Sequence, residues 1–265
     1  MSNVLVVDVG TQSMRGIVFD DKGNLLVKKQ VKYKPYLSKE NGYMEQDPDM
    51  YWEVFCSITK AIAEERPDLM DSVLALSVDT FRDTVVLLDE HNKPVRNAIL
   101  WSDQRTADAS DPLPLKQRFL FKLVGMDRPI RAIRSKVKTR WVMQNEPEVW
   151  ARVRRVVHIS AYLNYRITGK LIDCYSSSMG HIPFDNKGKK WFTKHSLLYP
   201  VFDVPLEYAN ITLCAPGDVM GEVSEQVAAQ TGLPVGLKLI ASDSDKGCET
   251  LGVGCLQRNV ASISF

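Results

Sequence analysis

"VDVGTQSMRG", residues 7–16, joins the end of an apolar run to an aspartate, a glycine, small polar residues and an arginine. The apolar residues 4–7 predict a β-strand that is buried on both faces. Two further β-rich runs, "RGIVFD" and "LLVKKQVKYK", are separated by the turn-forming "DKGN". The first thirty or so residues therefore predict an antiparallel β-meander that opens the sheet of an α/β fold.

Three buried-looking strands end in carboxylates, which are costly to bury unless they are paired or bound to a cation. Asp8 follows "VLVV", Asp79 follows "LALSV", and Asp243 and Asp245 follow "LKLIAS". In open α/β sheets, ligands bind beyond the carboxyl ends of the strands. If the three strands are neighbours, we expect their acids to converge at one cleft.

The turn after Asp8 has the chemistry of a phosphate site. Gly10 allows a tight turn, residues 11–13 offer N–H and hydroxyl donors, and Arg15 adds a forked donor. Together with Asp8, these groups predict Mg²⁺ that is bound largely through water and carries the phosphates of a nucleotide. The alternative is an ordinary hairpin in which the aspartate and the threonine hydrogen-bond their own backbone.

Two other strand ends offer groups for a substrate and for proton transfer. Arg82 and Asp83 in "DTFRDTVV" could hydrogen-bond the hydroxyls of a polyol, or form only a local ion pair in a surface turn. Asp245 lies where a strand ends and a helix begins, so it could accept a proton from a hydroxyl that attacks phosphorus. The alternatives are a helix N-cap at Asp245 and the neighbouring Asp243 in the catalytic role.

The remaining patterns predict helices and further strands around this sheet. An apolar stripe predicts a helix that starts near Asp47-Pro48. Residues 104–169 have a mostly helical period, and "GEVSEQVAAQTGLPVG" predicts a short helix that ends at Gly232. "TVVLLD" and "AILW" predict two more strands, and the apolar "NVASISF" at residues 259–265 predicts the beginning of another.

The composition argues against several classes of protein. The 265 residues carry 34 Lys plus Arg against 32 Asp plus Glu, a net charge of +2 that gives no bulk attraction to nucleic acid or membrane. The first residues do not read as a signal sequence, and no apolar run is long enough to span a bilayer. Five scattered cysteines without a CxxC pair predict reduced thiols in a cytoplasmic protein, and four histidines without HxH or HExxH spacing argue against zinc.

A basic stretch at residues 131–140, continued by Arg152, Arg154 and Arg155, raises the question of a nucleic-acid patch. Its cations recur at helical spacing among acids and aromatics, which favours a solvated helix face instead. We therefore expect no nucleic-acid partner.

Several ordered motifs resemble the N-terminal domain of the FGGY carbohydrate kinases, the group that includes glycerol kinase, xylulokinase and ribulokinase. "DVGTQSMR" is similar to the family's first phosphate motif, and "GYMEQDPDMYW" to its Glu-Gln-Asp-Pro segment before a helix. "TVVLLDEHNKPVRNAILWSDQRT" is similar to its strand pair with a Trp-x-Asp-x-Arg signature. "NEPEVW", "AYLNYRITGKLIDCYSSSMG" and "TGLPVGLKLIAS" follow in the family's order, so the resemblance covers nearly the whole chain.

The resemblance implies a ribonuclease H-like domain of the actin and hexokinase type, with a mixed sheet that opens with a β-meander and is flanked by helices. It implies an ATP-dependent kinase of a sugar or small polyol, assisted by Mg²⁺, with its site between two such domains. Residues 1–255 would be the substrate-side domain, and residues 256–265 the start of a C-terminal ATP-binding domain. We expect the isolated chain to have little activity. The implied partners are the substrate, ATP, the C-terminal domain and, as one option, a second copy in a homodimer.

The resemblance also implies roles for the residues of the phosphate turn. Asp8 would position Mg²⁺ and its water. Gly10 and the rest of the turn would lie near the phosphates of the nucleotide. Thr11, Gln12 and Arg15 would lie near the phosphoryl group that is transferred.

The substrate side is implied in the same way. Arg82 and Asp83 resemble glycerol kinase's Arg-Glu-Thr and would bind substrate hydroxyls. Asp245, seven residues before Gly252, matches the family's catalytic aspartate and would be the general base and a second metal contact. Lys246 would occupy the adjacent substrate-binding position.

Some positions depart from the family pattern. "SDS" at residues 242–244 replaces glycines that usually precede the catalytic aspartate, and the extra acid could raise the pKa of the base or tighten metal binding. Asp83 replaces a glutamate, and Ile133 falls near a substrate-contacting tyrosine of glycerol kinase, which argues against glycerol itself. These departures keep a second function open, a catalytically impaired sugar-binding or regulatory module on a kinase-like scaffold.

Overall fold

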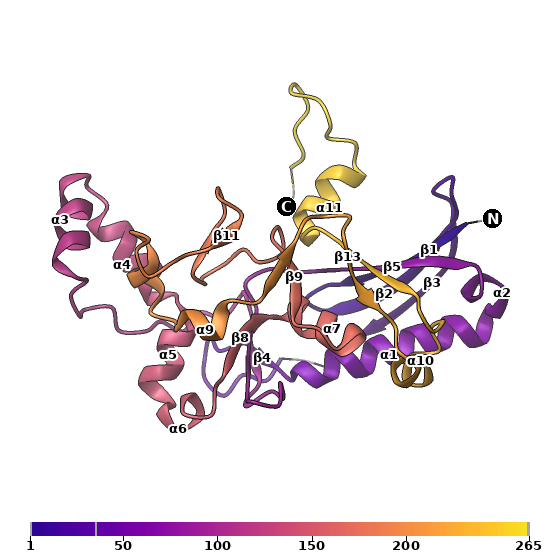
Figure 1. Cartoon of the computed structure of the whole chain (residues 1–265), viewed down its shortest axis with the longest axis horizontal. Coiled ribbons are helices and arrows are strands. Elements are labelled where there is room, and N and C mark those ends of the chain that lie inside the picture. The colour runs from indigo at the N-terminus through magenta and orange to yellow at the C-terminus, as the bar shows by residue number, and fades with distance from the viewer. Residues whose placement is uncertain (1, 35, 264–265) are drawn as a thin grey trace.

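The computed structural model describes residues 2–34 and 36–263, which combine helices with a mixed sheet (Figure 1). The central six-stranded sheet has the order β13-β14-β5-β1-β2-β3. Its strands β1 (Asn3–Val9), β2 (Ser13–Phe19) and β3 (Leu25–Lys32) pair antiparallel in sequence order. The predicted meander is therefore confirmed.

Three strands of this sheet run parallel and end at the same edge. β5 (Val73–Thr80) lies between β1 and β14 (Lys238–Ala241) and is parallel to both. β13 (Val219–Glu222) completes the far edge as an antiparallel neighbour of β14. The prediction that residues 221–222 begin a helix is wrong, because their backbone groups pair with β14.

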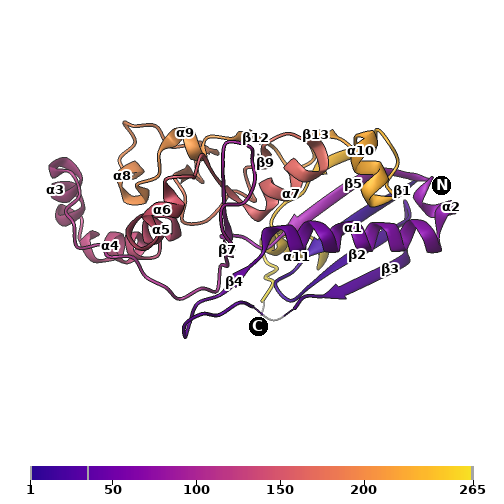
Figure 2. The same cartoon turned by 90° about the horizontal axis from the view of Figure 1, so that it is seen from below.

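One face of the central sheet is covered by helices α1 (Pro48–Glu65), α7 (Ile159–Thr168) and α10 (Glu225–Thr231), as Figure 2 shows. α1 begins where expected, with the N-cap Asp47 accepting a hydrogen bond from the backbone N–H of Asp49 at 2.9 Å. The helix crosses β2 at a glycine: a Cβ on Gly16 would lie 2.4 Å from Cγ2 of Ile58. A side chain at this position of β2 would therefore push the helix off the sheet.

The other face of the sheet is more open, which corrects the prediction that β1 is buried on both faces. Burial alternates along β1: Leu5, Val7 and Val9 are fully buried beneath the helices, whereas Val6 and Asp8 between them are partly exposed. Asp8 therefore points to the open face. Its register partner on β5, Asp79, has the same orientation, and both carboxylates can reach solvent or a ligand.

A second, four-stranded antiparallel sheet stands beside the first, with the order β4-β7-β6-β8. It consists of β4 (Glu45–Gln46), β7 (Ala98–Ile99), β6 (Val85–Leu88) and β8 (Arg155–His158). The strands predicted from "TVVLLD" and "AILW" are thus present as β6 and β7, but in this sheet. β6 is buried along its whole length, because Val85 and Leu87 pack in a second apolar cluster while Val86 and Leu88 belong to the main core.

The stretch from residue 104 to residue 169 is less helical than its period predicts. Residues 104–114 contain no helix, and β8 interrupts the stretch before α7. Another group of helices extends away from the central sheet (Figure 1). These are α3 (Leu115–Leu123), α4 (Asp127–Ser135), α5 (Lys138–Asn145), α6 (Pro147–Trp150), α8 (Tyr199–Phe202) and α9 (Leu206–Ala209).

The smaller elements complete the chain. They are α2 (Pro67–Met70), the parallel pair β9 (Ile172–Cys174) and β12 (Thr212–Cys214), the hairpin β10 (Phe184–Asp185) and β11 (Lys190–Trp191), and α11 (Asp245–Gly252). The strand predicted in "NVASISF" does not form over residues 259–263, where no neighbouring strand offers a partner, and residues 264–265 lie outside the described residues. No helix in the described part of the chain is long and apolar enough to cross a membrane.

Candidate active site

Asp8 and Asp79 lie next to each other where two parallel strands of the central sheet end. They are register partners in β1 and β5. β14 runs on the other side of β5, and a short connection leads from its end to α11, which begins at Asp245 and packs against β5. β1, β5 and β14 are therefore neighbours, which was the condition for their acids to converge at one edge of the sheet.

The pKa of the Asp79 carboxyl group reflects the other negative charges at this edge of the sheet. Burial raises the pKa of Asp79 to about 7, aided by the negative charges of Asp8 and, less strongly, of Asp245 and Glu249. No described residue forms an ion pair with Asp79. Such a concentration of carboxylates favours a cation.

The carboxylates at this edge suit a hydrated Mg²⁺ better than a metal ion that is enclosed by protein ligands. Among residues 2–34 and 36–263 there is no group of three or more His, Cys, Asp or Glu side chains that could hold a metal ion. Mg²⁺ keeps several of its waters and is usually held by one or two carboxylates together with substrate phosphates. The carboxylate oxygens at this edge meet that requirement, whereas a zinc site needs nitrogen or sulfur ligands.

The turn between β1 and β2 is tight and open to ligands. The N–H of Gly10 donates to the carbonyl of Ser13 at 3.0 Å, and a Cβ on Gly10 would lie 3.1 Å from the same oxygen. The Asp8 carboxylate pairs with the Arg15 guanidinium at 2.5 Å, and the hydroxyl of Thr11 accepts from Nε1 of Trp101 at 3.1 Å. Within the described residues, neither side chain hydrogen-bonds the turn backbone, so the alternative of a self-satisfied hairpin is wrong.

A groove of about 460 Å³ brings together residues that are far apart in the sequence. Its predicted members come from the phosphate turn, the loop after β5 and the start of α11: Thr11, Arg82, Asp83, Asp245 and Lys246. Its other walls are Phe81, Trp101, Met179 and Gly180, for which the sequence analysis proposed no role. Trp101 stands in the quoted Trp-x-Asp-x-Arg signature, so a signal for it was present.

A second hollow of about 820 Å³ adjoins this groove and contains the rest of the phosphate turn, including Gly10, Gln12 and Arg15. The two spaces share Thr11 and Trp101, whose hydrogen bond lies between them. The residues of the phosphate turn and the predicted substrate-binding residues therefore occupy neighbouring spaces, whereas Asp8 lines neither of the two.

Asp83 is held by residues that the sequence analysis missed. Its carboxylate accepts from the backbone N–H of His181 and contacts the His181 ring Nδ1, each at 2.8 Å, while its carbonyl accepts from the Lys138 ammonium at 2.6 Å. Burial would raise the pKa of Asp83, but the hydrogen bonds from His181 and the charge of Lys138 hold it well below its usual range. The adjoining Gly180 makes room, because a Cβ there would lie 2.4 Å from Asp83 Oδ1.

The structure separates the two candidate catalytic acids. The N-cap of α11 is Ser244, which accepts from the N–H of Gly247 at 3.4 Å, so Asp245 is the first residue of the helix and does not cap it. Asp243 accepts from the N–H of Ser244 at 2.6 Å and lines a different hollow. Of the two carboxylates, only that of Asp245 lines the groove.

Lys246 also lines the groove, and its ammonium pairs with Glu249 at 2.7 Å. Ile133 does not line this groove; it lies on α4 and is partly exposed. The loose alignment of Ile133 with a substrate-contacting tyrosine therefore finds no support in the geometry.

The basic stretch 131–140 is not the fully solvated helix face that its spacing predicts. Three of its cations, Arg134, Lys138 and Arg140, are at most 7% exposed. They form ion pairs within the chain because buried charges need partners. Helical spacing alone does not reveal that acids from remote loops cover these side chains.

Comparison with known proteins gives a consistent match. Residues 3–252 match the FGGY family of carbohydrate kinases, N-terminal domain. The chain is 31% identical over 273 residues to a xylulose kinase of Lactococcus lactis subsp. lactis (strain IL1403), a match that covers 100% of this chain and 52% of that protein. It is 24% identical over 267 residues to a glycerol kinase of Janthinobacterium sp. (strain Marseille), covering 99% and 52% of the two chains.

Solved structures agree at the level of the fold. The crystal structure of xylulose kinase from Rhodospirillum rubrum matches with a TM-score of 0.79 and 20% identity, over 95% of this chain and 52% of that chain. The predicted fold class, a ribonuclease H-like domain of the actin and hexokinase type, is confirmed. The chain spans about half the length of the relatives that it matches.

Proposed function

The chain belongs to the FGGY family of carbohydrate kinases, and from this premise we propose that it forms the substrate side of an ATP-dependent kinase acting on a hydroxyl of a sugar or small polyol. The observation that carries the proposal is the groove in which Arg82 and Asp245 meet the phosphate turn at Thr11. An acceptor alcohol, a base and a phosphate site are the parts that phosphoryl transfer requires.

In the proposed reaction Asp245 is the general base. Its carboxylate lines the groove at the first turn of α11, so it can accept the proton of a substrate hydroxyl as that oxygen attacks the γ-phosphorus. The N-terminus of α11 adds partial positive charge at this end of the groove, where the phosphates of ATP would lie. Asp243 lines a different hollow and is not proposed as the base.

Mg²⁺ would be held near Asp8 and Asp245, and when bound it would offset charge on the phosphates of ATP. The residues of the turn have a separate task. Gly10 lets the backbone approach the phosphates closely, Thr11 and Gln12 add donors, and the guanidinium of Arg15 faces them from β2. Since Arg15 is paired with Asp8, we propose that a phosphate oxygen replaces or shares this contact when nucleotide binds.

Arg82, Asp83 and Lys246 are proposed to bind and orient the substrate. The carboxylate of Asp83 is fixed by His181 and Lys138, so it offers its remaining lone pairs to a hydroxyl in a preset direction. Trp101, half exposed at the edge of the groove, provides an apolar wall against which the carbon chain of a sugar can pack. Positioning of this kind, with electrostatic stabilisation, supplies most of the catalysis in phosphoryl transfer.

The nucleotide base is proposed to bind a second domain. Relatives of twice this length carry such further sequence, and we propose that residues 1–255 form the substrate-side domain and that residues 256–265 lead into an ATP-binding one. The 265-residue chain alone should then show little turnover. Robust ATP-dependent phosphorylation by this chain would contradict the proposed division.

A second candidate function is a sugar-binding or regulatory module without catalysis. It is favoured by one observation, the replacement of the family's glycines by residues 242–244, which places a further acid beside the proposed base. An ADP-release assay against ketoses, aldonates and polyols, on a version joined to a second domain, separates the two functions. ADP release with one substrate class supports the kinase, whereas sugar binding without ADP release supports the module.

A further inference from the structure

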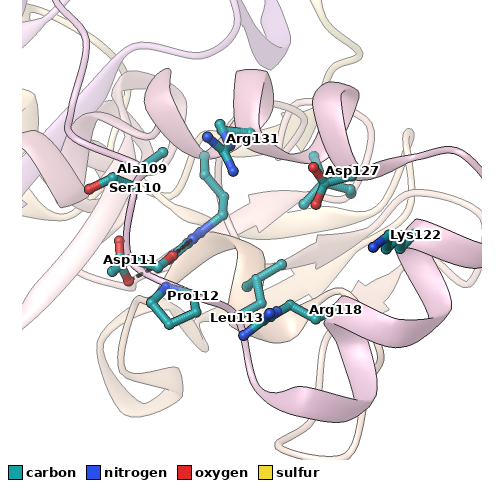
Figure 3. Close-up of a pocket in the computed structure, with 11 residues that line it drawn as sticks. Ala109, Ser110, Asp111, Pro112, Leu113, Arg118, Lys122, Asp127 and Arg131 are labelled. Atoms are coloured by element: carbon teal, nitrogen blue, oxygen red, sulfur yellow. Dashed lines mark hydrogen bonds and ion pairs between the residues drawn. The ribbon is translucent and has the colours of Figure 1, made fainter.

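A hollow of about 400 Å³ lies between α3 and α4, far along the chain from the phosphate turn. Figure 3 shows Arg131, Lys122 and Arg118 arranged around it, with Asp111 and Pro112 at one side. It shares no lining residue with the groove of the candidate active site. Because basic side chains surround the hollow, we ask which anion it would bind.

The buried charges at its base are already balanced. Arg134 is 3% exposed, lines the hollow, and donates to the carbonyl and the carboxylate of Asp111 at 2.8 and 2.9 Å and to Asp203 at 3.3 Å. Arg140 pairs with the same two carboxylates. Two arginines and two aspartates therefore form a closed network, which provides a rigid floor and no spare negative charge.

The cations at the rim are not balanced in this way. The side chains of Arg118, Lys122 and Arg131 form no hydrogen bond or ion pair with any described residue, and Asp127 is the acid left unpaired among the described residues that line the hollow. The rim therefore carries a net charge of about +2, which favours an anion with two negative charges. The Nε of Arg134, which also lines the hollow, is buried without a hydrogen-bond partner in the described residues, so a donor is left there for an anion.

We propose that this hollow binds a small phosphate monoester, with the phosphate held by Arg118, Lys122 and Arg131. Guanidinium groups bind phosphate oxygens in pairs, and a lysine adds a point charge. The volume is that of a metabolite-sized site. The side chains of Leu113 and Ile130 also line the hollow and offer apolar contact for the carbon skeleton of the ester.

The test measures binding of inorganic phosphate and of a hexose phosphate to the 265-residue chain by calorimetry at low salt. The double variant Lys122→Gln/Arg131→Gln removes two rim charges without touching the buried network. The matched control, Lys116→Gln/Arg128→Gln, makes the same charge change at exposed positions of the same two helices that do not line the hollow. Each lost charge-assisted hydrogen bond should weaken binding by about tenfold.

We expect the hexose phosphate to bind the wild-type chain more tightly than inorganic phosphate, and the rim variant to lose affinity while the control retains it. Equal losses in both variants, or no binding by the wild type, would overturn the proposal. The product of the proposed kinase is itself a phosphate ester, so the variant Arg82→Gln is measured as well. Loss of binding in Arg82→Gln alone would place the ester in the groove and refute the second site without bearing against the kinase.

Discussion

Replacing Asp79 with asparagine should stabilise the folded chain at alkaline pH and leave its stability almost unchanged at acidic pH. Asparagine has nearly the same shape as aspartate but cannot ionise. Asp79 forms no ion pair with a described residue, so the substitution removes a charge and breaks no salt bridge. The expected gain comes from relieving the repulsion and desolvation that act on this carboxylate.

The magnitude follows from the pKa of the group. The pKa of Asp79 is raised from its ordinary value of 3.8 to about 7 in the folded chain. At 1.36 kcal/mol per pKa unit this difference corresponds to ~4 kcal/mol. Because the side chain is not completely buried, we take this figure as an upper limit.

The direction in which stability changes with pH depends on whether the folded or the unfolded chain holds the proton of Asp79. Between the two pKa values the folded chain keeps a proton that the unfolded chain has released, so the free energy of unfolding falls as the pH rises. This loss is absent below about pH 4, increases up to about pH 7 and is constant above it. Asp79→Asn should therefore gain up to ~4 kcal/mol near pH 8 and almost nothing near pH 4.

Urea unfolding followed by tryptophan fluorescence measures the effect at a series of pH values. Asp71→Asn, at an exposed position just before β5, serves as the control and should change stability little at any pH. The reasoning would be refuted if Asp79→Asn changed stability by the same amount at both ends of the pH range, or if it destabilised the chain above pH 7.

Three further predictions concern the fold and the site. Gly16→Ala should cost about 1–3 kcal/mol of stability by overpacking against α1, while Gly252→Ala, where a Cβ meets no neighbour within 4 Å, should cost much less in the same urea assay. Asp83→Asn should cost about 3–5 kcal/mol near neutral pH, because it leaves the buried Lys138 without its counter-charge. The pKa of Asp83 is lowered in the folded chain, so its contribution to the free energy of unfolding is present above the ordinary carboxyl pKa and is lost as the pH falls through the pKa of the folded chain. If the loss of stability in Asp83→Asn did not shrink in strong acid, this account would be contradicted. Mg²⁺ should raise the thermal midpoint of the chain near pH 8 by binding the folded state, and this rise should disappear in Asp8→Asn; an equal rise in both chains would place the ion elsewhere.

The sequence predicted those parts of the fold that local patterns control. The meander, the helix from Pro48 and the strand that carries Asp79 each have apolar periodicity and turn formers of their own. The carboxylates at strand ends were informative because an unpaired acid after an apolar run is costly to bury. A sequence shows both the apolar run and the acid that follows it, so this cost can be recognised without a structure.

What the sequence could not predict depends on contacts between remote segments. Asp83 adopts a positive φ of 57° and is held by Lys138 and His181, and no local pattern links these three positions. The short pairing of residues 221–222 with β14, and the burial of Arg134, likewise depend on tertiary partners. Helical periodicity therefore assigned a solvated face to arginines that the fold covers with acids.

The most direct measurement of the central claim is ATP-dependent turnover with Asp245→Asn, in a version of the chain joined to a second domain and supplied with its substrate. Asp243→Asn is the matched control, because it makes the same change at a carboxylate that does not line the groove. The account predicts that Asp245→Asn abolishes turnover while nucleotide still binds, and that Asp243→Asn retains turnover. Normal turnover in Asp245→Asn, or loss of turnover in Asp243→Asn alone, would contradict it.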